Sequence, residues 1–83
     1  MDLSQLNRLT ANSTYRELGL RAKEYLQYFN AGGEEEYLAE ITMYNSMVSL
    51  LRDLGMTLEQ AEEYCDNRDN LLELAQYISS IWG

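Results

Sequence analysis

The sequence has no histidine, no proline and only one cysteine, Cys65. Without histidine, the chain lacks the commonest general base, the usual partner of a nucleophilic Ser or Cys, and the usual zinc ligand. Carboxylates are present, but an acid pair is catalytic only when its surroundings separate the two pKa values across a substrate cleft, and 83 residues leave little room for one. We therefore predict a protein that is not an enzyme and has no catalytic residue, cofactor or bound metal.

The chain also lacks the features of an exported or membrane protein. A lone cysteine cannot form an internal disulfide, so we interpret Cys65 as a small, half-buried thiol. No stretch approaches the roughly 18 apolar residues of a spanning helix. Residues 1–5 lack the basic and apolar regions of an export signal. These absences predict a cytoplasmic protein without a membrane partner.

Basic residues are scarce: six Lys and Arg stand against 14 Asp and Glu, for a net charge of −8. The imbalance lies in one part of the chain, because residues 1–31 carry a net charge of +1 and residues 32–83 carry −9. Such a field repels nucleic acid phosphates and attracts basic surfaces. Direct binding of nucleic acid is therefore disfavoured, and we predict that the partner is a basic surface of a protein or ribonucleoprotein complex.

The composition is that of a folded chain. Hydrophobic residues make up 46% of the sequence, more than disordered acidic chains contain. Apolar residues recur at intervals of three and four, and no segment shows the alternation of a strand. The sequence therefore predicts a single helical domain over residues 1–83, an all-α, compact bundle of four to five short helices.

Caps and breaks predict where these helices begin and end. A Ser, Thr or Asn followed three residues later by Glu or Gln fits the capping box, in which both side chains bind free backbone amides. Three pairs have this spacing: Thr14 with Glu17, Thr57 with Gln60, and Asn70 with Glu73. Gly32-Gly33 and Gly55 fit helix ends, and a polar run over 66–70 separates the last two helices. The expected helices cover about 4–10, 14–29, 34–54, 57–65 and 70–82.

One face of the expected fourth helix carries a row of acids. Glu59, Glu62, Glu63 and Asp66 recur at i, i+3, i+4 and i+7, and like charges at this spacing destabilise a helix by a few tenths of a kcal/mol per pair. Phosphates recur on a comparable scale, so the row can occupy a groove that evolved for nucleic acid. The alternative is a solvated face that keeps a small bundle soluble. We expect four acids of the third helix to extend the row: Glu34, Glu35, Glu36 and Glu40.

Tyrosines are a second candidate feature, because the chain has seven, more than so small a core can bury. Tyrosine anchors many protein interfaces, since it presents a large rigid ring with a polar tip. We select Tyr28, which lies off the main apolar stripe of its helix, and Tyr37 as candidate anchors. The alternative is that most of the rings pack in the core with their hydroxyls at its rim. In the third helix we expect one apolar face, made of Tyr37, Ile41, Tyr44, Val48 and Leu51.

One segment resembles ubiquitin-associated domains in its loop and helix spacing. It comprises Leu54-Gly55-Met56-Thr57 with Glu59-Gln60-Ala61, then Asn70 with Leu72-Glu73-Leu74-Ala75 and Tyr77-Ile78. The resemblance covers about a third of the chain and implies that Gly55, Met56 and residues 74–78 contact an apolar patch of ubiquitin. The sequence departs from the family at the aromatic loop position, which Met56 occupies, and at Tyr64-Cys65. We do not assign the chain to this family.

Together these features predict a small acidic inhibitor that binds a basic, nucleic-acid-binding surface of a partner complex by mimicking nucleic acid. By class analogy alone, such proteins occur among phage inhibitors of host defence, including anti-CRISPR proteins. The main alternative is a homo-oligomeric helical assembly protein, and a binding module like the ubiquitin-associated domains is a third. We expect a monomer or a homodimer. The seam of an oligomer would use the face from Tyr37 to Leu51 or the C-terminal Ile81-Trp82.

Overall fold

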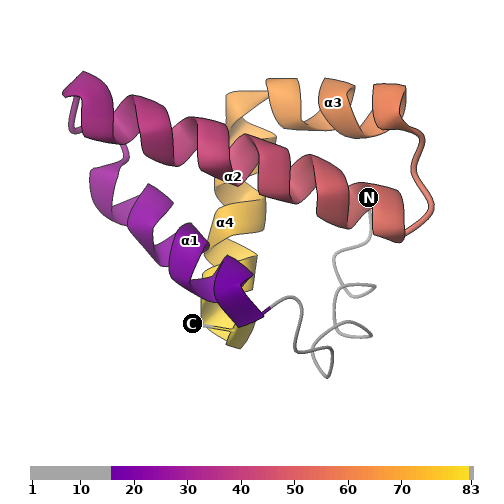
Figure 1. Ribbon diagram of the computed structural model, residues 1–83, viewed down its shortest axis with the longest axis horizontal. Helices are drawn as coiled ribbons and strands as arrows, with labels where there is room; N and C mark the ends of the chain where they lie inside the picture. The colour runs from indigo at the N-terminus through magenta and orange to yellow at the C-terminus, as the bar shows by residue number, and fades with distance from the viewer. Residues whose placement is uncertain (1–15, 83) are drawn as a thin grey trace.

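The computed structural model describes residues 16–82, which form four α-helices (Figure 1). They are α1 (Arg16–Tyr28), α2 (Gly33–Asp53), α3 (Leu58–Asp66) and α4 (Arg68–Trp82), and these residues include no strand. The predicted all-α bundle of four to five helices is confirmed. The helix expected over 4–10 and the Thr14 end of the first capping box lie outside the described residues.

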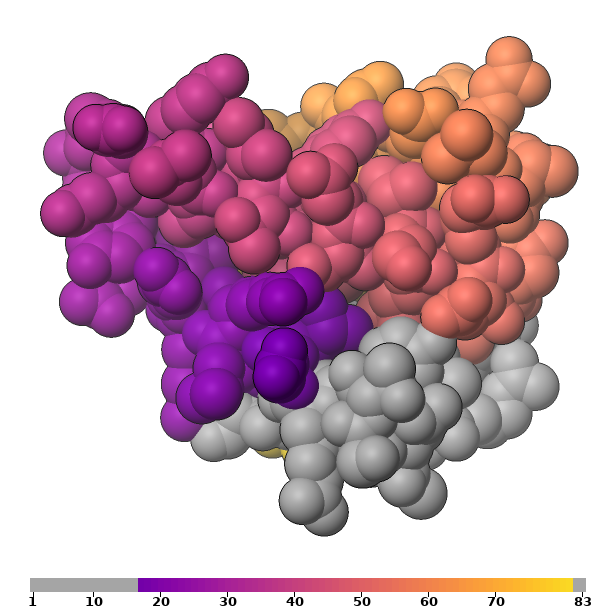
Figure 2. Space-filling model, in the orientation of Figure 1, coloured from indigo at the N-terminus to yellow at the C-terminus, as the bar shows by residue number. Residues whose placement is uncertain are grey.

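The longest helix, α2, lies between α1 and α3. Figure 1 shows α1 along one side of α2, α3 along the other, and α4 crossing behind α2. Both α1 and α3 pack against α2 and α4. Side chains of α2 therefore form the middle of the face shown in Figure 2.

Apolar side chains from all four helices form the core. Among the described residues no polar or charged residue is buried, so apolar packing rather than buried ion pairs holds the helices together. Full burial of one Leu, Ile or Met side chain contributes about 1.5–3 kcal/mol. The core consists of Leu18, Ala22 and Tyr25 of α1, Met43, Met47, Val48, Leu50 and Leu51 of α2, Ala61 and Cys65 of α3, and Leu71, Leu74, Ala75 and Ile78 of α4.

The buried face of α2 differs from the expected one. The helix buries Met43, Met47 and Leu50 completely, whereas Tyr37 is 63% exposed and Ile41 40% exposed. Val48 and Leu51 are buried as expected, and Tyr44 is only partly buried. Apolar residues surround most of this helix, so its periodicity fits two faces equally well. The other helices cover the methionine side, whereas the N-terminal part of α2, with Tyr37 and Ile41, extends beyond the end of α3 and leaves both side chains exposed.

The α2–α3 connection agrees with the sequence. The amide of Gly55 donates to the Arg52 carbonyl at 3.0 Å and the amide of Met56 to the Leu51 carbonyl at 3.2 Å, which is a Schellman motif. Gly55 has φ 106°, a conformation that side chains with a Cβ rarely adopt. The predicted capping box then starts α3: Thr57 Oγ1 accepts from the amide of Gln60 at 3.1 Å, and Gln60 Oε1 accepts from the amide of Thr57 at 3.0 Å.

The expected start of α4 at Asn70 was wrong. The helix begins at Arg68, because Asn67 Oδ1 accepts from the amides of Asp69 at 2.9 Å and Asn70 at 3.3 Å. Asn70 lies inside the helix, and its Nδ2 donates to the carbonyl of Tyr64 in α3 at 3.2 Å. The polar run over 66–70 thus has one non-helical residue, Asn67, which both ends α3 and caps α4.

We expect Thr57→Ala to lower the free energy of unfolding by about 1 kcal/mol, because the amide of Gln60 loses its acceptor at the start of α3. Urea unfolding followed by circular dichroism measures the change. The matched control is Thr42→Ala at an exposed position inside α2, which should be neutral or slightly stabilising because alanine is the better helix former. Equal losses in the two variants would contradict a stabilising role for the box.

Candidate functional site

The acidic row of α3 lies on the outer side of that helix. Glu59, Glu62, Glu63 and Asp66 are all exposed, whereas Ala61 and Cys65, on the opposite side, are buried against the bundle. Within residues 16–82, the three glutamates form no hydrogen bond or ion pair. The four acids therefore lie on one exposed face of α3, and three of them present unpaired carboxylates to solvent.

Asp66 at the end of the row is tied to α2. Its Oδ1 accepts a hydrogen bond from the Tyr44 hydroxyl at 3.0 Å. Partial burial, this hydrogen bond and the charges of Asp66 and Glu62 together raise the pKa of Tyr44 to about 12. Tyr44 is therefore a neutral donor at physiological pH, and it fixes the direction of the Asp66 carboxylate.

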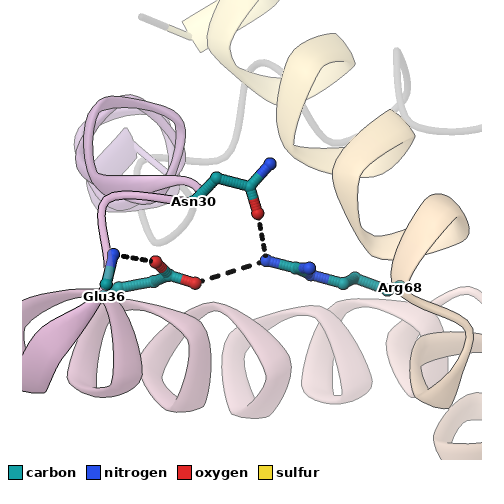
Figure 3. A network of polar contacts seen from close by, with 4 residues as sticks. Asn30, Glu36 and Arg68 are labelled. Carbon is teal, nitrogen blue, oxygen red and sulfur yellow. Dashed lines mark hydrogen bonds and ion pairs between the residues drawn. The ribbon is translucent and has the colours of Figure 1, made fainter.

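Glu36, which the sequence assigned to the row, belongs to a polar network near the start of α2 (Figure 3). Its Oε1 accepts from Arg68 Nη2 at 3.3 Å, and its Oε2 accepts from the amide of Gly32. Arg68 Nη2 also donates to Asn30 Oδ1 at 2.9 Å, and the guanidinium lies over the Phe29 ring, 4.5 Å from its centroid. Arg68 thus joins the start of α4 to the α1–α2 connection and to α2.

The four candidate acids of α2 do not form one line. Glu34 and Glu35 are exposed, whereas Arg68 pairs with Glu36 and Glu40 is only partly exposed. Burial and then the charge of Glu40 raise the pKa of the core residue Tyr25, while Arg68 acts in the opposite direction. Glu34 also lies about 15 Å along α2 from Tyr44, the residue that contacts α3. The exposed acids therefore form two groups, one on α3 and one at the start of α2.

The two candidate tyrosines lie on different surfaces. Tyr28 is partly buried and lines a groove of about 260 Å³ between α1 and α2, together with Arg21, Glu35 and Leu38. Tyr37 is two turns before Tyr44 on the same face of α2, so it lies on the side that carries α3. The structure therefore places Tyr37, but not Tyr28, on the same side of α2 as the acidic row.

Most of the C-terminal contacts implied by the resemblance to ubiquitin-associated domains are not available. Leu74, Ala75 and Ile78 are 0% exposed and pack in the core, so they cannot contact a partner while the bundle is folded. Gly55 remains exposed and Met56 partly so. The spacing that resembles the family is here the spacing of core residues on α4.

Sequence reasoning missed the role of Arg68 and the open apolar side of α2. Arg68 was placed in a polar turn, and its contacts with Asn30 and Glu36 span 38 and 32 residues, so no local pattern indicates them. The sequence did indicate the open apolar side, because apolar residues occur around most of the circumference of α2. In so small a bundle, the other helices cannot cover all of that apolar surface.

Comparison with protein-family models, with curated proteins and with solved structures gives no match. Between residues 16 and 82, no helix is long and apolar enough to cross a membrane. In the same range, no group of three or more Cys, Asp or Glu side chains is placed to hold a metal ion. The described residues form a small helical bundle with an acidic face on α3.

We expect Arg68→Ala to lower the free energy of unfolding by about 1–2 kcal/mol, because it removes the stacking on Phe29 and the hydrogen bond to Asn30. Arg68→Lys should recover less than half of this loss, because an ammonium keeps the charge without the planar fork. Urea unfolding measures both variants against Arg52→Ala, which removes an exposed arginine at the other end of α2. A loss of stability no greater than that of the control would show that the network contributes no more than an ordinary surface ion pair.

Burial and then the charge of Asp66 raise the pKa of the Cys65 thiol from 9.0 to about 11. Because the thiolate is the reactive form, the native protein should resist alkylation by iodoacetamide near pH 8 and react rapidly once denatured. The raised pKa adds stability that is complete below about pH 9 and is lost as the pH rises to about 11. Cys65→Ala should lack this part of the pH dependence, whereas fast native alkylation would contradict the burial.

Proposed function

We propose that this protein binds a basic, nucleic-acid-binding surface of a partner protein or ribonucleoprotein complex and inhibits the complex by occupying that surface. The observation that carries the proposal is the exposed row of α3, in which three of the four carboxylates have no partner in the described part of the chain. By class analogy alone, we propose that the protein is an inhibitor of the phage anti-defence type, a class that includes anti-CRISPR proteins. We further propose that it acts in the cytoplasm.

The spacing of the row supports mimicry of nucleic acid. An α-helix rises about 1.5 Å per residue, so the four carboxylates between Glu59 and Asp66 are spread over about 10.5 Å of axis. The axial steps are about 4.5, 1.5 and 4.5 Å, an average of about 3.5 Å per charge, close to the roughly 3.4 Å of duplex axis per phosphate of one B-DNA strand. The row therefore resembles a strand of phosphates in charge and in average charge density, although its steps are unequal.

The rigidity of the row supports the same proposal. The capping box of Thr57 fixes the start of α3, Ala61 and Cys65 anchor its inner side, and Tyr44 holds Asp66 at the far end. The backbone beneath the row is fixed in this way, so binding has to order only the glutamate side chains, which favours affinity. The repulsion between its carboxylates is tolerated because packing of the inner side stabilises the helix.

We expect the triple variant E59Q/E62Q/E63Q to lose the partner, with capture reduced at least about tenfold, because the phosphate-like charges are gone while the side-chain shape remains. The matched control E17Q/E24Q/E73Q also removes three exposed acids, so both variants have a net charge of −5 instead of −8. The measurement is capture by the tagged protein from a lysate of its native host across a salt series, with mass spectrometry of the bound proteins.

The proposal predicts that the wild type and the control retain a nucleic-acid-binding complex that is released by rising salt and displaced by added DNA or RNA. Equal capture by both triple variants would overturn the role of the row. Capture that responds to the row but is not displaced by nucleic acid would exclude mimicry and leave a simple charge contact. Circular dichroism of each variant checks that the bundle is intact.

A further inference from the structure

On one face of α2 lies a column of large side chains that other helices cover only at its α3 end, where Tyr44 contacts Asp66. Tyr37, Ile41 and Tyr44 are spaced at i, i+4 and i+7, and we call them the α2 column. Tyr37 is 63% and Ile41 40% exposed, and Leu38, beside them, is 52% exposed. Figure 1 shows the reason, because this part of α2 extends beyond the end of α3.

Elsewhere in the described chain, two large apolar side chains are exposed, and they lie on different helices. Leu20 on α1 is 67% exposed and Leu58 at the start of α3 is 47% exposed, and single side chains of this kind are normal on a protein surface. In the α2 column, by contrast, exposed apolar side chains adjoin one another on one helical face. Contiguous apolar surface with a polar border is typical of an interaction site.

Acids border the α2 column at both ends. At the α3 end, the Tyr44 hydroxyl donates to Asp66, and Glu62 is close enough for its charge to help raise the pKa of Tyr44. At the other end, the exposed Glu34 lies one turn before Tyr37. Arg68, at the start of α4, directs its guanidinium to Glu36, Asn30 and Phe29. The border of the column is therefore acidic.

This border determines what can cover the column. A second copy related by a two-fold axis would bring the same acids of two chains together, each chain with a net charge of −8, and like charges across an interface are strongly unfavourable. Nucleic acid and anionic lipid are repelled for the same reason. A protein segment with an apolar side chain between Lys or Arg residues is complementary to both the column and its border.

We propose that the α2 column, with Glu34, Glu62 and Asp66, is the docking site for a basic amphipathic segment of the partner, whose apolar side chain lies on Tyr37 and Ile41 while its Lys or Arg side chains reach the three acids. The inference rests on the proposed function and adds that the partner's basic surface has an apolar residue at its centre. The acids then supply rapid association, and the column supplies the contacts that slow dissociation.

The test uses a synthetic helical peptide of about 14 residues, with leucines on one face and lysines and arginines on the other. Isothermal titration calorimetry measures its affinity, and ¹⁵N NMR locates its binding site on the protein. We expect shifts at residues 37, 41, 44 and 66. The variant Y37A/I41A should bind about tenfold more weakly, while the control L20A/L58A, which trims two equally exposed side chains elsewhere, should bind as the wild type does.

Two further peptides separate this inference from the proposed function. A peptide with serine in place of every leucine should bind at least about tenfold more weakly, and one with glutamate in place of every basic residue should not bind. Equal binding of the serine peptide, or unchanged affinity of Y37A/I41A, would overturn the docking site while leaving the acidic row to act by charge. Absence of binding by the leucine peptide would also overturn the docking site. The capture experiment would still test the role of the acidic row of α3 independently.

A second copy as the occupant is tested by sedimentation. A dimer of the wild type that dissociates in Y37A/I41A would overturn the inference and favour an assembly protein. A monomer that binds the leucine peptide supports it. Because both side chains are exposed, the variant should fold, and Ile41→Gln alone provides a milder change that should weaken peptide binding in the same direction.

Discussion

Arg68 links separate parts of the bundle, because its side chain joins the start of α4 to the α1–α2 connection and to α2 at one point. It binds Asn30 in the α1–α2 connection, pairs with Glu36 in α2 and stacks on Phe29 (Figure 3). Only Asn67 separates Arg68 from the end of α3, so fixing the start of α4 also fixes where α3 ends. The apolar core provides most of the stability, and this partly exposed network adds a polar link between α4, the α1–α2 connection and the start of α2.

The network also divides the acids into two kinds. Those that point toward the bundle, Glu36 and Glu40, act on Arg68 and on the buried Tyr25, whereas the three glutamates on the outer side of α3 form no hydrogen bond or ion pair in the described structure. A small chain has too little interior to hide its apolar residues and too few basic residues to neutralise its acids. Exposed apolar residues and unneutralised acids therefore lie next to each other on the surface, where Tyr44 contacts Asp66. This juxtaposition connects the proposed charge mimicry with a defined contact surface.

Much of the fold was predictable because its signals are local. The Thr57 box, the left-handed Gly55 and the inner stripe of α1, represented by Leu18 and Ala22, all involve residues within one or two turns of one another. The start of α4 was misplaced although its signal is also local, because Asn67 and Asn70 are both good caps and the spacing of Asn70 with Glu73 fitted the capping box. The structure uses Asn67 for the cap and Asn70 to hold the Tyr64 carbonyl.

The amino-acid sequence by itself determined the helical class, most helix boundaries, the excess of acid in the second part of the chain and the alignment of four acids on one side of α3. These depend on spacing along a single helix, which the helical period sets. Only the tertiary structure decided that α2 leaves Tyr37 and Ile41 exposed, and that Glu36 pairs with Arg68 rather than facing solvent. Both outcomes depend on which helices approach α2 and from which side, and that is set by the simultaneous packing of four helices, not by any one segment.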